Sequence, residues 1–259
     1  MNKIMNKIMN KRMVKRKITI ITISFCLLVL TPLTLAADPL KEAGIAFSRG
    51  DYASAIKLTS TIISKADDQR KIIALIRRGE AYRALGHLRE ARSDLNSAII
   101  LAQQQQQTLM EAIASLSLGQ ILFQQQNYSQ ASKLLQATQL LAQKQKQPLI
   151  EAAAMNTIGN ILSNQNQQSE AINNYRAALK LAEQGSDIAL RVASRRNLAK
   201  ALGNNIEATE QLKIAKQEAL TIPNLYERAK LLLAIAEDDK FSYPLLSEVL
   251  AISKQLNSP

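Results

Sequence analysis

The sequence predicts an all-α protein built from stacked helical hairpins, and three observations support this. Only 8 Gly and 6 Pro occur in 259 residues, which leaves little material for the many tight turns of a β-sandwich or barrel. Ala, Leu, Ile, Gln, Lys and Arg dominate the composition instead, and this favours helix. A small residue also recurs inside an apolar helical pattern at intervals of 36, 40, 40 and 40 residues. These small residues are Ala43, Gly79, Gly119, Gly159 and Ala199.

The first segment has the features of a leader peptide. Residues 1–17 are basic, residues 18–30 are an apolar run, and small residues follow up to Ala37. Because this is the layout of a secretory signal peptide, we expect residues 1–37 to be cleaved off. An uncleaved signal anchor is the alternative, since the apolar run and the small residues together span about 20 residues. Both interpretations place the rest of the chain across the cytoplasmic membrane, in the periplasm or secreted.

The net charge of +12 is largely explained by this leader. Seven of the 33 basic residues and none of the 21 acids lie in residues 1–37, so 26 basic and 21 acidic residues remain. A basic surface for nucleic acid is therefore not expected in the folded part. The single cysteine, Cys26, also lies in the leader, so we expect neither a disulfide nor a cysteine-based site after cleavage.

Each of the first four units is predicted to be a helical hairpin. An alanine follows each small residue after twelve positions and opens a second helical stretch. Small residues at fixed points let two helix axes approach closely, while Leu, Ile and Tyr fill the space around them. One hairpin cannot bury its apolar faces alone, so the hairpins must stack. The four alanines are Ala55, Ala91, Ala131 and Ala171.

The last two units are less regular. In the fifth, Ala208 follows Ala199 after only nine residues, which predicts a three-residue deletion at the turn. A sixth pair is expected over residues 223–237 and 242–256 and should cap the stack. An irregular helical bundle is the alternative architecture. The second helix of the sixth pair should bury Leu245, Leu246, Val249, Leu250 and Leu256.

These motifs resemble the tetratricopeptide repeat. Residues 50–55 read Gly-Asp-Tyr-Ala-Ser-Ala, Gly119 follows a Leu, and Gly159 follows an Ile in a unit that continues to Tyr175. The resemblance covers about residues 38–220, although the family's leading Trp is absent and the 40-residue period exceeds the common ~34. It implies a right-handed solenoid of five to six repeats over residues 38–259, with capping helices at the C-terminus.

The resemblance also implies a function. In this family the concave face, built from the first helix of each pair, binds peptides or partner proteins, so we expect an exported scaffold or adaptor. An accessory or regulatory subunit of a neighbouring envelope machine or CHAT-type peptidase is the alternative, because long repeats of this kind occur beside such bacterial peptidases. The candidate peptide-binding residues on the concave face are Phe47, Arg83, Gln120, Phe123, Asn156, Asn160, Asn164, Arg196 and Lys200.

Four of these residues suggest a carboxylate site. Asn156 and Asn160 share one helix face, and Arg196 and Lys200 share the corresponding face of the next first helix. Amides beside a guanidinium and an ammonium could hold a partner's carboxylate. This is similar to the family's carboxylate clamp, although that clamp draws on three repeats and two match here. The alternative is that these residues only solvate the concave face, and core packing is the equivalent alternative for the two phenylalanines.

Catalysis is not expected. The only histidine, His87, has no cysteine or second histidine to form a zinc site or a relay. No phosphate-binding glycine loop is present, so we expect no enzyme activity, cofactor or metal. A cryptic hydrolase on a helical scaffold is the remaining alternative. Glutamine runs at residues 103–107, 124–126 and 143–147 are expected to be solvated helix ends and loops rather than a sticky polar surface.

Overall fold

The computed structural model describes residues 38–65, 67–238 and 243–256, which form twelve α-helices and no strand. The all-α prediction is confirmed, and the predicted leader lies outside the described residues. The helices pair into six successive hairpins. Their first helices are α2 (Pro39–Ser48), α4 (Asp68–Leu85), α6 (Thr108–Gln124), α8 (Pro148–Asn164), α10 (Ile188–Leu202) and α12 (Leu225–Asp238). Their second helices are α3 (Tyr52–Lys65), α5 (Leu88–Gln104), α7 (Tyr128–Lys144), α9 (Gln168–Glu183), α11 (Ile206–Leu220) and α13 (Tyr243–Leu256).

Uniform turns set the 40-residue period in the middle of the chain. Helices α5 to α8 have 17 residues each, and three-residue turns join them. After α5, Gln106 adopts a left-handed backbone with φ 54°, and the Gln107 amide donates to the Ala102 carbonyl at 2.8 Å. This is the Schellman ending of a helix. The same turn follows α6, α7 and α8, so the glutamine runs are helix ends and loops, as predicted.

The recurring small residues are contact points between paired helices. A Cβ atom on Gly119 would lie 2.6 Å from Leu135 Cδ2, and one on Gly159 would lie 2.6 Å from Tyr175 Cε1. The four alanines that open the second helices are at most 1% exposed. Large and small side chains therefore interlock at each pair, which is the packing that the spacing predicts.

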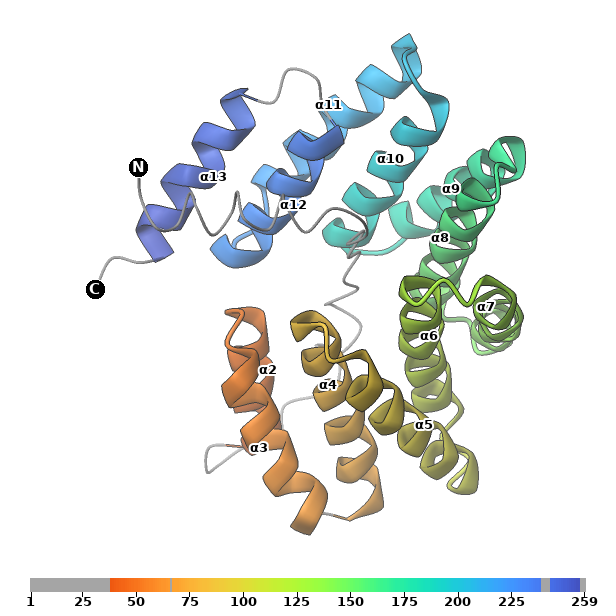
Figure 1. Cartoon of the computed structure of the whole chain (residues 1–259), viewed down its shortest axis with the longest axis vertical. Coiled ribbons are helices and arrows are strands. Elements are labelled where there is room, and N and C mark those ends of the chain that lie inside the picture. Colours follow the sequence, from red (N-terminus) through yellow and green to blue (C-terminus); the bar gives the residue numbers. More distant parts are fainter. Residues whose placement is uncertain (1–37, 66, 239–242, 257–259) are drawn as a thin grey trace.

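Successive hairpins stack on one another to form an arc. One apolar cluster runs from Ile72 in α4 to Leu190 in α10 and joins the central hairpins. Figure 1 shows α4, α6, α8 and α10 on the inner side of the arc and α5, α7 and α9 outside them. Within the described part of the chain, no helix is long and apolar enough to span a membrane.

The fifth and sixth hairpins differ in detail from the sequence prediction. The α10–α11 turn, residues 203–205, keeps three residues, so the deletion shortens the flanking helices instead. In α13, Leu245 and Val249 are buried as expected, but Leu250 and Leu256 are 38% and 47% exposed. Among the described helices α13 packs mainly on α12, and its side with these two leucines stays partly exposed.

Candidate functional site

Residues 40 positions apart occupy equivalent places on neighbouring first helices and form polar columns on the inner wall, the inward side of α4, α6, α8 and α10. Gln120, Asn160 and Lys200 form one column, and Asn156 and Arg196 belong to another. All but Lys200 are less than 9% exposed. The predicted asparagines lie on α8 and the predicted cations on the next first helix, α10, and each pair has its own partners.

The two asparagines are held by neighbouring side chains. The Tyr175 hydroxyl of α9 donates to Asn160 Oδ1 at 2.8 Å, and Asn197 Nδ2 of α10 donates to Asn156 Oδ1 at 3.2 Å. Asn164 Nδ2 donates to the Asn160 carbonyl at 2.7 Å. These bonds fix the amide orientations and leave the remaining hydrogen-bonding groups of Asn156 and Asn160 inside a buried polar layer.

The two cations of the predicted clamp already face a carboxylate of the same chain. Arg196 Nε forms an ion pair with Asp238 Oδ2 at the end of α12, and Lys200 Nζ lies 3.9 Å from Asp238 Oδ1. The Arg196 side chain is 8% exposed, whereas Lys200 is 63% exposed. Burial raises the pKa of Tyr175, and the Arg196 charge opposes that increase. The sequence analysis did not identify Asp238 as a partner of these cations.

The other candidate residues lie elsewhere on the wall. Phe47 packs edge-on against Tyr52 of its own hairpin with ring centroids 5.2 Å apart, and Phe123 packs against Tyr128 at 5.9 Å. Both rings are half-buried. Arg83 is 3% exposed and pairs with Glu80 on the same helix at 2.5 Å. Each ring therefore packs against a tyrosine at the turn of its own hairpin.

A second charge cluster faces Arg83 across the arc. Lys230 Nζ of α12 lies 3.4 Å from Glu227 Oε2. Burial lowers the pKa of Lys230; the Arg83 charge adds to this decrease, and the charges of Glu227 and Glu80 oppose it. Nothing in the sequence pattern places α4 beside α12, so the sequence analysis could not predict this cluster.

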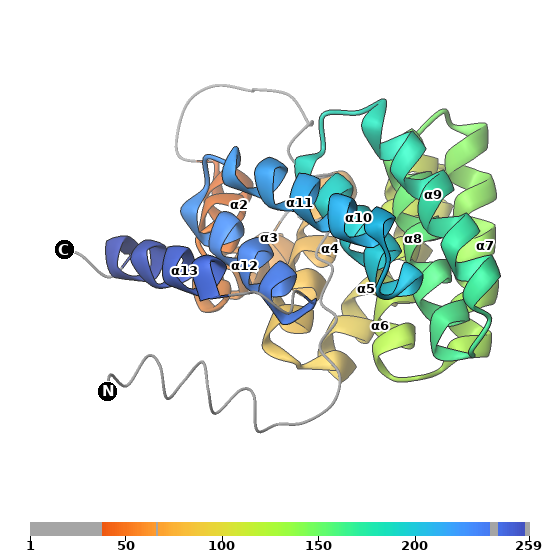
Figure 2. The same ribbon diagram turned by 90° about the horizontal axis from the view of Figure 1, so that it is seen from above.

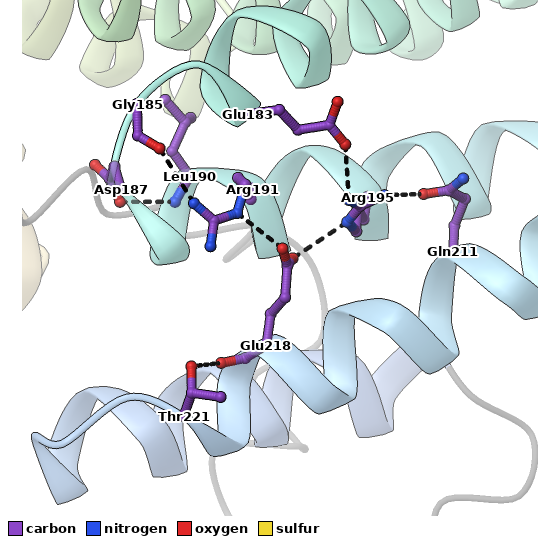
Figure 3. A network of polar contacts seen from close by, with 9 residues as sticks. All are labelled: Glu183, Gly185, Asp187, Leu190, Arg191, Arg195, Gln211, Glu218 and Thr221. Atoms are coloured by element: carbon purple, nitrogen blue, oxygen red, sulfur yellow. Dashed lines mark hydrogen bonds and ion pairs between the residues drawn. The ribbon is translucent and has the colours of Figure 1, made fainter.

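A polar network behind the inner wall holds α10 in place (Figure 3). Glu218 of α11 accepts hydrogen bonds from Arg191 at 2.8 Å and from Arg195 at 3.1 Å. Arg195 also donates to Glu183 at 2.7 Å and to Gln211 at 2.8 Å. Both arginines are paired with carboxylates, so they hold α10 against α9 and α11 rather than add free positive charge beside Arg196.

The described residues contain no group of three or more His, Cys, Asp and Glu side chains placed to hold a metal ion. His87 stacks on Tyr82 at a centroid distance of 6.1 Å, in the turn before α5. Of the predicted amides and cations on this wall, Gln120, Asn156, Asn160 and Arg196 are at most 8% exposed, and Lys200 presents its charge to solvent.

Comparisons with known proteins were made for both sequence and fold. Residues 110–184 match the family model of the tetratricopeptide repeat. A search of curated proteins found no match. A solved Rap protein in complex with Competence and Sporulation Factor superposes with a TM-score of 0.66 at 17% identity, covering 85% of this chain and 66% of that one.

Two further solved structures resemble the chain. A signal transduction ATPase with numerous domains and a tetratricopeptide repeat sensor, from Pyrococcus horikoshii, has a TM-score of 0.60 at 20% identity and covers 85% of this chain and 36% of its own. Aspartyl phosphate phosphatase F from Bacillus subtilis has a TM-score of 0.62 at 15% identity, covering 84% and 58%. The chain thus spans less than two thirds of each of the three proteins.

At these identities the likeness concerns the fold alone. Six stacked hairpins, interlocking glycine contacts and the repeat match over residues 110–184 agree with one another. Together they show a helical-hairpin solenoid of the tetratricopeptide type, in which residues 110–184 match the repeat itself.

Proposed function

We propose that this protein is an exported, non-catalytic scaffold that binds a polypeptide partner on the concave side of its hairpin stack. The fold is one that serves protein–protein interaction, and the Rap protein of similar fold is seen in complex with Competence and Sporulation Factor. The observation that carries the proposal is the contact at Arg196, where a buried guanidinium and an exposed ammonium meet one carboxylate.

A carboxylate of the partner would take the place of Asp238. Arg196 supplies a fork of donors, Lys200 supplies a point charge in solvent, and Asn160 supplies an amide beside them. Because only five charged side chains occur in residues 98–169, the rest of the wall would recognise its partner through hydrogen bonds to exposed amides such as Asn164. The half-buried rings of Phe47 and Phe123 would provide apolar contacts.

Peptide binding provides the test. The protein is screened against a library of short peptides with free C-terminal carboxylates and against the same library in amidated form. We expect binders whose affinity falls at least tenfold on amidation and falls similarly in Arg196→Ala and Asn160→Ala. Asp238→Asn should raise the affinity, because it removes the competing charge.

Two matched variants control this experiment. Arg176→Ala breaks an arginine–carboxylate pair with Glu207 in which both side chains are about half exposed, and Glu237→Gln neutralises the exposed acid next to Asp238. Both should leave peptide affinity unchanged. Equal binding of amidated and free peptides would refute the carboxylate site, and the absence of any peptide binder would refute the proposed function.

Export is tested separately. Asp38, the first residue after the expected leader, caps α2 through its side chain and pairs with Arg70 at 2.5 Å. This supports cleavage between residues 37 and 38, because Asp38 itself takes part in the fold through these two contacts. Expression of the full chain followed by N-terminal sequencing should find Asp38 first in the exported fraction, while retention of residues 1–37 would favour the signal anchor.

A further inference from the structure

Two ends of the arc meet through side chains far apart in the sequence. Asn224 Nδ2, just before α12, donates to the Ser48 carbonyl at the end of α2 at 3.1 Å. The hydroxyls of Tyr52 and Tyr226 lie 3.1 Å apart and share a hydrogen bond. Each pair spans more than 170 residues of sequence. The first and sixth hairpins therefore touch: Figure 1 shows α2 and α12 at the two facing ends of the arc, and in Figure 2, seen from above, α2 lies behind α12.

A glycine allows this approach. Gly50, in the α2–α3 turn, has a φ of 78°, and a Cβ atom there would lie 2.6 Å from two ring atoms of Tyr226. Gly86 occupies the same place in the next hairpin with a φ of 83°, but nothing lies within 4 Å of its Cβ position. Both turns need glycine for their backbone, yet only Gly50 also makes room for a residue from the other end of the chain.

The contact is weak compared with the joints between neighbouring hairpins. An apolar cluster spans the central hairpins, and separate clusters serve α2–α4 and α10–α13. No described cluster contains buried residues of both α2 and α12. The two hydrogen bonds that close the contact are neutral, and a neutral hydrogen bond contributes little net stability because water replaces it when it breaks.

Separation at this point would leave no charge without a partner. The ion pairs nearest to the contact are Arg83–Glu80 on α4 and Lys230–Glu227 on α12, and each joins residues three apart on one helix. Both pairs would stay intact if α4 and α12 moved apart. Lys230 would gain solvation, since burial now disfavours its charge. Opening thus avoids the large penalty of an unpaired buried ion.

We propose that Ser48, Gly50, Tyr52, Asn224 and Tyr226 form a clasp at which the ring of hairpins opens and closes, giving a polypeptide access to the concave side. Weakly held contacts between well-packed units are where a protein opens most easily. The clasp itself follows from the contacts above, and only its role in admitting a partner rests on the proposed function. A chain threaded behind the closed clasp would be held by enclosure as well as by its own contacts.

Distance measurement between two spin labels tests the clasp without any partner. Arg49 and Thr221 are exposed and flank the two sides of the contact, and Cys26→Ser removes the only native cysteine. Labels on Arg49→Cys and Thr221→Cys should give a major short distance and a minor longer one. Gly50→Ala and Tyr226→Ala should each increase severalfold the fraction of molecules with the longer label-to-label distance, whereas Gly86→Ala should not.

Each result decides the proposal. A severalfold shift in both clasp variants, with helix content unchanged by circular dichroism, supports it. An equal shift in Gly86→Ala would assign the effect to turn strain and overturn it, as would a distance that neither clasp variant changes. A single short distance in the parent protein would also overturn it, because the ring would then be permanently closed. Since no peptide is present, failure of the peptide screen does not affect this outcome.

Discussion

The central and C-terminal hairpins of this chain keep their shape by different means. In residues 98–169 no described side chain forms an ion pair, and the helices are held by interlocking contacts such as Gly119 with Leu135. In the fifth hairpin, arginines of α10 are fixed by Glu218 and Glu183. In the central hairpins, where the helix lengths repeat, steric fit positions each helix against its partner. In the fifth hairpin, where the helices are shorter, charge pairs position the helices.

The difference has a physical reason. The same steric contact can form in every central hairpin, because the same small and large residues recur every 40 positions. In the fifth hairpin the three-residue deletion moves the equivalent large residue to Leu212, four positions after Ala208, and its side chain is only partly buried, whereas its counterparts Leu135 and Tyr175 are at most 3% exposed. Charge pairs supply orientation there, although they gain less stability per contact because both partners must be desolvated.

The largest expected effect comes from breaking the steric fit. Leu135→Ala should lower the free energy of unfolding by about 3 kcal/mol, since this fully buried side chain leaves a cavity against Gly119. The midpoint of chemical denaturation measures it, and Leu140→Ala, a 66% exposed leucine on the same helix, should change little. In the double variant with Gly119→Ala the loss should be smaller than the sum of the single losses, because the new methyl group fills part of the cavity. Strict additivity would contradict the interlocking model.

The next effect comes from breaking the charge network. Glu218→Ala should cost about 2 kcal/mol, because it leaves two mostly buried arginines with fewer acceptors. Glu210→Ala, on the same helix, removes an exposed pair with Lys213 and should cost less than about 0.5 kcal/mol. If the two variants unfold at the same denaturant concentration, the network does not stabilise the fifth hairpin.

A smaller effect should appear at the uniform turns. Gln106→Gly should raise stability by about 0.5–1 kcal/mol, since a side chain at φ 54° is strained and glycine is not. Gln105→Gly, one residue earlier at φ −98°, should lower it slightly. Thermal denaturation of both variants compares them, and a loss of stability in both would show that the left-handed turn carries no strain to relieve.

The smallest effect depends on pH. Burial raises the pKa of Asp187, so the folded state binds its proton more tightly than the unfolded state does, and the stability from this group is lost as pH rises through the folded pKa. Asp187→Asn keeps an oxygen to cap the Leu190 amide of α10 and should be more stable than the parent at pH 7, with the difference vanishing below the ordinary value of 3.8. Asp67→Asn, at an exposed cap of α4, should show no such gain.

Much of the fold could be predicted because the pattern that encodes it is local. Small residues 40 positions apart fixed the helix pairing, and Gly159 does meet Tyr175 as the spacing implied. The exposure of Leu250 and Leu256 was predicted wrongly, since periodicity marks an apolar face without telling whether a neighbour covers it.

The candidate site could be predicted only in part. The columns that align Asn160 with Lys200 follow from the period, so the juxtaposition of amides and cations was foreseeable. The partners of these side chains were not, because Asp238 reaches Arg196 from 42 residues away and the Tyr175 hydroxyl reaches Asn160 from another helix. Such contacts depend on how far each hairpin rotates against the next, which no local pattern records.

The meeting of Tyr226 with the α2–α3 turn also bears on how this architecture could change in length. Most solenoids gain or lose modules freely, since every module touches only its neighbours. Here the rotation accumulated over six hairpins brings Tyr226 onto Gly50. A duplicated or deleted 40-residue module would shift one partner away from the other, so descendants with a different module number would lose this junction even if every individual hairpin folded perfectly.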